Sequence, residues 1–391
     1  MNVVIAAAGT GGHINPGLAI ADKICAKIPG TKIAFIGTPR GLENELVPKA
    51  GYQLERIDAW GLKKEISITN LIHMIRTYKS KVAVEAFLKD FKPDLVIGTG
   101  GYICGPVIKV ATDLLIPTIL HESNVFPGKA VRMFASRVDE VMTGFEETIK
   151  RLPKSTKKAV YTGTPTNIKK LDLTYGEREE LLKKIGYRLD IPNVLIFGGS
   201  QGAQMINEAV VGILANGLNK DYNIVWATGQ KQFDIVKETL EEKGMDINKL
   251  TNATIVPYIY NMEEHMNVAD LVVCRSGAMT CTELTTIGKP AIFVPLPSTG
   301  ANRQLDNARV IEVAGGAMVI RNNELTWNNL SIMVNRIVHD KNKLELMSKG
   351  MLRMAPPDNV EDLIFREIVK LLDLDEDEIR DPRMADPRVK L

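Results

Sequence analysis

A glycine-rich stretch that ends in a histidine is the first part of the sequence whose residue types and spacing could do chemistry. Residues 6–21 read AAAGTGGHINPGLAIA, so Gly9, Gly11 and Gly12 come where an apolar strand turns into a helix. Such a turn presents unpaired N–H groups at the positive end of a helix dipole, which attracts phosphate. His13 titrates near neutral pH and could be a general base, could orient substrate, or could be a polar residue at a helix start.

Similar polar turns follow other apolar strands. They read IGTGGYICGP at 97–106, HESNVFPG at 121–128, GGSQGA at 198–203, CRSGAMTCTE at 274–283 and PLPSTGANRQLDN at 295–307. The glycine spacings match neither the dinucleotide fingerprint nor the P-loop, which weakens nicotinamide and nucleoside-triphosphatase interpretations. In open α/β sheets ligands bind outside the carboxyl ends of the strands, so the sequence predicts a ligand cleft between two domains.

The elements that must position these turns alternate along the whole chain. Short β-branched runs are separated by segments of helical length, a pattern that indicates parallel sheets. The predicted strands are Val3–Ala7, Ile33–Gly37, Leu95–Gly98, Thr118–His121, Val138–Thr143, Val194–Phe197, Ile224–Ala227, Ala253–Val256, Leu271–Cys274 and Ala291–Leu296.

The pattern restarts at Asn193, where NVLIFGGSQGAQMIN repeats the strand, glycine turn and helix of NVVIAAAGTGGHINP. The fold class predicted is therefore α/β, with two Rossmann-like domains and a cleft between them. Its predicted parts are a domain at 1–165, a domain at 166–355, a helix at 356–373 that packs back on the first domain, and a charged, disordered tail at 374–391.

Composition narrows the function classes. The chain has 391 residues, of which 45% are hydrophobic, and four scattered cysteines that suit a reducing compartment and suggest no zinc site. Neither a secretory leader nor an apolar span of membrane length is recognisable, so we expect a cytoplasmic protein. Residues 1–163 carry 22 Lys and Arg against 15 Asp and Glu, whereas the rest carries 27 against 32. A basic first half facing an anionic partner and an accident of surface composition both fit this asymmetry.

Taken together, six motifs resemble the bacterial MurG family of peptidoglycan synthesis. They are GTGGHINPGLAIA, GTGGYICGP, HESNVFPGKA, GGSQGAQMIN, CRSGAMTCTEL and RQLDNA, in that order over residues 9–308. The resemblance implies the two-domain GT-B architecture and inverting transfer of N-acetylglucosamine from UDP-GlcNAc to undecaprenyl-diphospho-muramoyl-pentapeptide, lipid I. It implies no cofactor and no metal, and no nucleic acid as a partner.

The resemblance also implies roles for individual residues. His13 is expected to be the catalytic base, and Gly9, Gly11, Gly12, Gly100, Gly101 and Tyr102 to hold the acceptor diphosphate. The residues expected to bind UDP-GlcNAc are Thr10, Gly11, Gly12, Asn124, Ser200, Ile259, Ala278, Met279, Thr280, Cys281, Thr282, Glu283 and Gln304. Glu283 is suited to accept both ribose hydroxyls, or else is only an acid favoured in the first helical turns. The sequence departs from the usual motifs at Cys104, Ser123, Asn167 and Arg303.

A lipid-linked acceptor implies a peripheral location on the cytoplasmic face of the cell membrane, on its anionic inner leaflet, with cell-wall and division machinery as further partners. Residues 61–89 mix apolar and basic side chains as an interfacial segment does, although an ordinary amphipathic helix fits the same pattern. Three alternative functions stay open: another GT-B sugar transferase, a UDP-sugar epimerase, and a nucleotide-sugar-binding scaffold without turnover.

Overall fold

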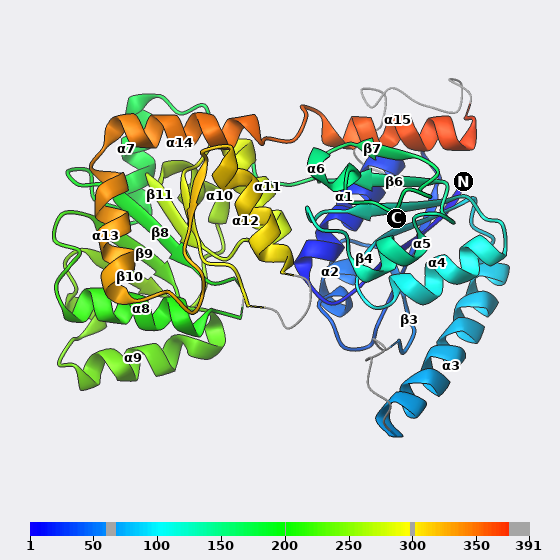
Figure 1. Ribbon diagram of the computed structural model, residues 1–391, viewed down its shortest axis with the longest axis horizontal. Coiled ribbons are helices and arrows are strands. Elements are labelled where there is room, and N and C mark those ends of the chain that lie inside the picture. Colours follow the sequence, from blue (N-terminus) through cyan, green and yellow to red (C-terminus); the bar gives the residue numbers. More distant parts are fainter. Residues whose placement is uncertain (60–67, 200, 298–301, 375–391) are drawn as a thin grey trace. The chain divides into compact units, whose positions relative to one another are not determined.

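The chain forms two compact units. The computed structural model describes residues 1–59, 68–199, 201–297 and 302–374, with the backbone alone for 68–78. Unit 1 comprises Met1–Thr166 and the segment that starts at Pro356, and unit 2 comprises Asn167–Ala355 (Figure 1). Each unit is built on one parallel β-sheet, which confirms the prediction of two Rossmann-like α/β domains.

Unit 1 contains both predicted and unpredicted strands. Its described strands are β1 (Asn2–Ala7), β2 (Lys32–Gly37), β3 (Gln53–Arg56), β4 (Leu95–Gly100), β5 (Thr118–Glu122), β6 (Glu140–Thr143) and β7 (Ala159–Tyr161). Its described helices are α1 (Gly11–Lys27), α2 (Glu43–Lys49), α3 (Ile68–Phe91), α4 (Cys104–Asp113), α5 (Lys129–Phe134), α6 (Glu146–Ile149) and α15 (Val360–Leu372). Strands β3 and β7 were not predicted, because each is a short edge strand that is only partly buried.

The sheet of unit 1 has the order β3-β2-β1-β4-β5-β6-β7. Side chains of β1 alternate between its two faces, as the twofold period of a strand requires. Val4 and Ala6 pack into the core under α3, α4 and α5, whereas Val3 and Ile5 pack into the core under α1 and α15. From β1 the chain adds β2 and then β3 on one side of β1, and it then crosses to the other side of β1 to form β4. The direction in which strands are added therefore reverses between β1 and β4.

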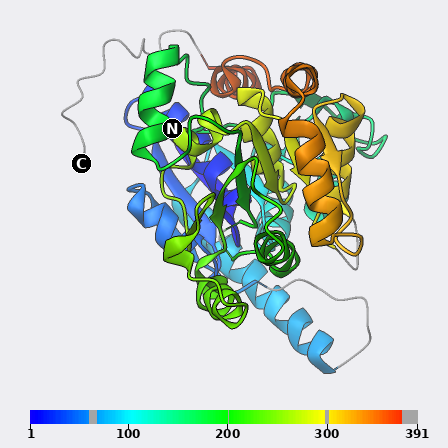
Figure 2. The ribbon, with the colours of Figure 1, turned by 90° about the vertical axis from the view of Figure 1, so that its left-hand side faces the viewer.

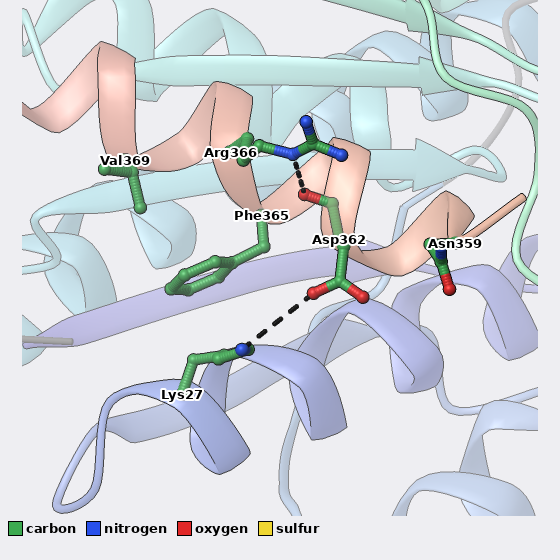
Figure 3. Close-up of a pocket in the computed structure, with 6 residues that line it drawn as sticks. All are labelled: Lys27, Asn359, Asp362, Phe365, Arg366 and Val369. Atoms are coloured by element: carbon green, nitrogen blue, oxygen red, sulfur yellow. Dashed lines mark hydrogen bonds and ion pairs between the residues drawn. The ribbon is translucent and has the colours of Figure 1, made fainter. Parts of the chain in front are cut away.

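Helix α15 brings the C-terminal part of the described chain onto unit 1. Phe365 and Ile368 are buried in the same core as α1, and Lys23 of α1 pairs with Asp362 at 2.6 Å. A cavity of about 460 Å³ lies between α15 and the end of α1, lined by Lys27, Asn359, Asp362, Phe365, Arg366 and Val369 (Figure 3). Because Lys27 ends α1, this cavity lies about 25 Å along the helix from the glycine turn.

Unit 2 repeats the same alternation. Its described strands are β8 (Asn193–Phe197), β9 (Asn223–Ala227), β10 (Ala253–Val256), β11 (Leu271–Cys274), β12 (Ala291–Phe293) and β13 (Ala317–Val319). Its described helices are α7 (Tyr175–Lys184), α8 (Gln204–Ala215), η1 (Gln230–Gln232), α9 (Phe233–Glu242), η2 (Ile247–Lys249), α10 (Met262–Val268), α11 (Ala278–Ile287), α12 (Arg303–Val313), α13 (Trp327–Val338) and α14 (Lys341–Arg353).

The sheet of unit 2 has the order β10-β9-β8-β11-β12-β13. Its connections change direction between β8 and β11, in the middle of the sheet. Trp226 of β9 is fully buried against α8 and donates its indole N–H to Asn207 at 3.1 Å. Strand β13 was not predicted, because it has only three residues and only Ala317 is fully buried.

Helix α3 lies at the outside of unit 1 in both views (Figures 1 and 2). This helix contains most residues of the predicted interfacial segment at 61–89. Residues 60–67 and the side chains of residues 68–78 lie outside the described part of the chain. Among the described residues, no helix has both the length and the apolar character that crossing a bilayer requires.

Candidate functional site

The first glycine turn holds His13 in a defined orientation at the end of β1. His13 Nδ1 lies 3.0 Å from the Ala8 carbonyl oxygen. A carbonyl only accepts, so this contact requires the proton on Nδ1 and leaves the acceptor lone pair of the neutral ring on Nε2. The His13 amide also donates to Thr10 O at 3.0 Å, and its carbonyl accepts from Thr99 Oγ1 at 2.7 Å. The ring therefore has the tautomer that a general base acting through Nε2 needs.

The second glycine turn packs directly against that ring. A Cβ at Gly100 would lie 2.3 Å from His13 Cδ2, and one at Gly101 would lie 2.4 Å from the Ala8 carbonyl oxygen. Both glycines also have positive φ, at +136° and +91°. Two chain segments thus approach each other so closely that only glycine fits, and Tyr102 next to them is largely exposed.

Cys104, one of the positions at which the sequence departs from the usual motifs, ties this turn to β1. The Cys104 thiol is placed to donate to the carbonyl oxygens of Ala6, at 3.0 Å, and Gly100, at 3.1 Å. Its sulfur also accepts from the Gly100 amide at 3.1 Å. Burial raises the pKa of the thiol to about 12, so it stays protonated and unreactive at neutral pH. A sulfhydryl in this place does the hydrogen bonding that a hydroxyl would do.

The turn after β5 is organised from inside. Glu122 accepts from the backbone and side-chain N–H groups of Asn124 at 2.9 and 3.0 Å, and from the Gly128 amide at 2.5 Å. His121 is buried with Nε2 3.0 Å from the Gly163 carbonyl oxygen, and burial lowers its pKa despite that carbonyl. These contacts commit the Glu122 carboxylate and Nε2 of His121 to groups of the loop and its neighbours.

In unit 2, a glycine turn and a helix start occupy neighbouring strand ends. Gly199 and Gly202, at φ +86° and +77°, carry the chain from β8 toward α8, while Ser200 between them lies outside the described residues. At the end of β11, helix α11 begins at Ala278. The Cys281 amide already donates to Gly277 O at 2.9 Å, so the N–H groups available at this terminus belong to residues 278–280.

The remaining predicted residues of α11 differ in what they can present to a ligand. Cys281 and Thr282 are buried in the core of unit 2, so their side chains are not at the helix surface. Glu283 is partly exposed, and burial of its carboxyl group raises its pKa to about 7. A carboxylate that is poorly solvated when empty gains from hydrogen-bond donors such as ribose hydroxyls.

Gln304 is held by its neighbours at the start of α12. Its Oε1 accepts from the Leu296 amide at 2.8 Å, and its backbone carbonyl accepts from Ser276 Oγ at 2.8 Å. The side-chain amino group is therefore the part of Gln304 suited to a sugar hydroxyl. Arg275 braces the same strand ends, because it donates to Val294 O at 2.9 Å and to the side chain of Asn322 at 2.7 Å.

Ile259, one of the residues expected to bind UDP-GlcNAc, is buried between two exposed tyrosines. Tyr258 and Tyr260 meet edge to face with ring centroids 5.0 Å apart, and Tyr260 is 86% exposed. The side chain of Ile259 is therefore not at the surface, whereas the rings of its two neighbours are.

Some of the predicted residues gather at one place in each sheet, whereas Asn124, Ile259 and Gln304 follow the other strands β5, β10 and β12. In unit 1, the turns at Gly9–Gly12 and Gly100–Tyr102 follow β1 and β4, the pair between which the connections change direction. In unit 2, the turn after Phe197 and the start of α11 follow β8 and β11, the equivalent pair. This is where open α/β sheets bind ligands. Thr10 and Asn124, predicted to bind the donor, belong to unit 1 with the acceptor residues.

Comparison with known proteins identifies the family. Residues 3–143 match the glycosyltransferase family 28 N-terminal domain, and residues 193–363 match the C-terminal domain of the same family. A relative from Acetivibrio thermocellus is 40% identical over 374 residues, 95% of this chain and 99% of the relative, and is named UDP-N-acetylglucosamine--N-acetylmuramyl-(pentapeptide) pyrophosphoryl-undecaprenol N-acetylglucosamine transferase. A relative of the same name from Alkaliphilus metalliredigens is 38% identical over 372 residues, 95% of this chain and all of the relative.

The chain belongs to this transferase family. The crystal structure of Acinetobacter baumannii MurG matches it with a TM-score of 0.71 and 28% identity, over 95% of this chain and 99% of that one. The predictions of the MurG family, of the two-domain fold and of a hexosyltransferase are thereby confirmed.

Sequence reasoning missed two charged residues that shape these turns. Glu43 starts α2 and accepts from the Gly9 amide at 2.8 Å, and Arg275 makes the contacts described above. An acidic residue in a first helical turn is common, and Arg275, although it lies in the motif CRSGAMTCTEL, was given no role of its own. Only their contacts across the fold distinguish them.

Proposed function

We propose that this chain transfers N-acetylglucosamine from UDP-GlcNAc to the 4-hydroxyl of the muramoyl unit of lipid I, which yields lipid II. The observation that carries the proposal is the 40% identity, over nearly the whole of both chains, with a transferase named for that reaction. Glycine turns at both points where the strand connections reverse direction support it, because two phosphorylated substrates have to be held.

Unit 2 would bind the donor. The N–H groups of residues 278–280 at the start of α11 would face the diphosphate, and Glu283 would accept hydrogen bonds from the ribose hydroxyls. Gln304 would donate to the sugar through its amino group. As the bond from the anomeric carbon to the diphosphate breaks, negative charge grows on the departing UDP, and a helix N-terminus stabilises that charge.

Unit 1 would bind and activate the acceptor. The amides of Gly11 and Gly12 start α1 and would hold the lipid diphosphate. The 4-hydroxyl oxygen forms the new bond to the anomeric carbon from the face opposite the leaving group, so the configuration inverts. Its proton passes to His13 Nε2, the nitrogen that the contact between Nδ1 and Ala8 leaves as acceptor.

Exposed apolar side chains support peripheral contact of unit 1 with an anionic membrane. Val82 of α3, Leu115 after α4 and Met133 of α5 are more than half exposed, and Leu115 is 90% exposed at φ +58°. Helices α3, α4 and α5 cover the same face of the sheet, and the exposed Lys79 and Lys129 lie on two of them. Apolar and basic side chains on neighbouring helices suit a headgroup interface.

A transfer assay tests the proposal directly. The purified chain is incubated with radiolabelled UDP-GlcNAc and a lipid I analogue, and the products are separated. We expect label in a disaccharide lipid, and much less of it with the variant His13→Ala. Epimerised UDP-sugar, label on a different acceptor only, or binding of UDP without turnover would each refute the proposed reaction.

A further inference from the structure

The end of the loop after β2 and the first residue of α2 hold Gly9, the first residue of the glycine turn, from two sides. The Gly9 amide donates to Glu43 Oε2 at 2.8 Å, and the Gly9 carbonyl oxygen accepts from the Leu42 amide at 3.3 Å. Glu43 is completely buried. Gly9 itself has φ +97°, which few other residues adopt without strain.

The Glu43 carboxylate joins the ends of two neighbouring strands. Its Oε1 accepts from the backbone amide and the hydroxyl of Thr38 at 2.9 and 2.7 Å, while Oε2 serves Gly9. Burial by itself would raise the pKa of Glu43, but the hydrogen bonds from Thr38 and Gly9 outweigh burial and lower it. The group is therefore an ionised acceptor beneath the turn at neutral pH.

These contacts change the expected role of Gly9. We expected its amide among the groups that hold the acceptor diphosphate, but that N–H points at Glu43. Gly9 instead stands between Ala8 and Thr10, whose carbonyl oxygens accept from the side chain and the amide of His13. A rotation at Gly9 would move both of these acceptors, and with them the imidazole.

We propose that Glu43 is a positioning residue of the acceptor site. By fixing Gly9, it sets the orientation of His13 and of the first amides of α1, which act on the acceptor in the function proposed above, on which this inference rests. A displacement of about 1 Å in such groups costs about 100-fold in rate. Glu43 does not touch the acceptor and acts only through the turn.

The variant Glu43→Gln removes the bond to Gly9, and Thr38→Val is its matched control. A glutamine has one acceptor oxygen, which we expect to stay with the two donors of Thr38, so that its amino group opposes the Gly9 amide. Thr38→Val removes only the hydroxyl bond to the same carboxylate and keeps the bond to Gly9. Both variants lose a buried hydrogen bond, but only one releases the turn.

Kinetics with the lipid I analogue and titration with UDP separate positioning from folding. We expect Glu43→Gln to lower kcat/KM for the acceptor about 10- to 100-fold, with UDP affinity unchanged because the donor residues of α11 belong to unit 2. Thr38→Val should stay within about threefold of the unmodified chain. The loss caused by Glu43→Gln should also shrink in a His13→Ala background, because residues that act together are not additive.

Two results would overturn the inference: equal kinetics for Glu43→Gln and Thr38→Val, or an undiminished loss in the His13→Ala background. If Glu43→Gln does not fold, Gly9→Ala replaces it, because a Cβ at Gly9 meets no atom within 4 Å and acts on the backbone alone. Gly9→Ala with normal acceptor kinetics would refute the inference equally. If the unmodified chain forms no disaccharide lipid, the proposed function fails. If the unmodified chain forms that product but Glu43→Gln and Thr38→Val have equal kinetics, only the role of Glu43 is refuted.

Discussion

The pH dependence of donor binding is the sharpest test of the site in unit 2, because one carboxyl group is expected to control it. Burial raises the pKa of Glu283 to about 7 from its ordinary 4.5. A shift of one pKa unit corresponds to about 1.36 kcal/mol. The rise in the pKa of Glu283 from 4.5 to about 7 therefore means that ionising this carboxyl group in the empty site costs about 3 kcal/mol more than in water. Ribose hydroxyls that donate to the carboxylate recover part of that cost when the donor binds.

The direction of the effect follows from which form accepts. The ionised form accepts from both hydroxyls, so affinity for UDP-GlcNAc should be highest above pH 7. It should fall by up to tenfold per pH unit below about 7, where the protonated form predominates. UDP-GlcNAc is the right ligand for this titration, because its diphosphate is esterified at both ends and keeps its charge across the range.

Calorimetric titration from roughly pH 5.5 to roughly pH 8.5 brackets this pKa. The variant Glu283→Gln should bind UDP-GlcNAc about 10- to 100-fold more weakly at the alkaline end, because charge-assisted hydrogen bonds are lost. Its affinity should also not depend on the ionisation of residue 283. Glu238→Gln, which changes an exposed acid on α9, is the control and should behave as the unmodified chain. A flat profile for the unmodified chain, or the same slope in Glu283→Gln, would show that Glu283 does not bind ribose.

Three further predictions concern unit 1. His13→Ala should lower kcat about 10²- to 10⁴-fold with UDP affinity unchanged, and a near-normal kcat would eliminate His13 as the base. Gly100→Ala, which would place a Cβ 2.3 Å from His13 Cδ2, should lower kcat at least about tenfold, and full activity would show that the ring can shift without loss. Val82→Glu combined with Leu115→Glu should reduce co-sedimentation with anionic liposomes at least about tenfold. Ile235→Glu, at an exposed apolar site in unit 2, should not reduce it, and equal sedimentation of both variants would place the docking face elsewhere.

The membrane prediction relies on the described residues of unit 1. Several apolar residues of the predicted interfacial segment, among them Ile72 and Ile75, have side chains outside the described part of the chain. Val82 and Leu115 carry the test instead, because their exposure is known. UDP affinity of both glutamate variants is the control for correct folding.

The amino-acid sequence by itself determined the alternation of strands and helices and the place of the glycine turns. Both are local properties: the strands around Val3 and Val194 are short β-branched runs, and a turn such as Gly9–Gly12 is recognisable because glycine relaxes the backbone where it stands. The edge strands β3, β7 and β13 escaped prediction because they are short and only partly buried, so their pairing with a neighbour, and not their composition, makes them strands.

The tertiary structure decided which groups in those turns face a ligand. The sequence placed Gly9 among the phosphate donors, yet the amide of Gly9 is committed to Glu43, which lies 34 residues away. Likewise Cys281 and Thr282 belong to the predicted donor motif, but helical geometry turns their side chains into the core and leaves Glu283 partly exposed. Local sequence fixes backbone conformation, whereas burial, the pKa of Glu283 and the partner of each N–H depend on residues that only the folded chain brings together.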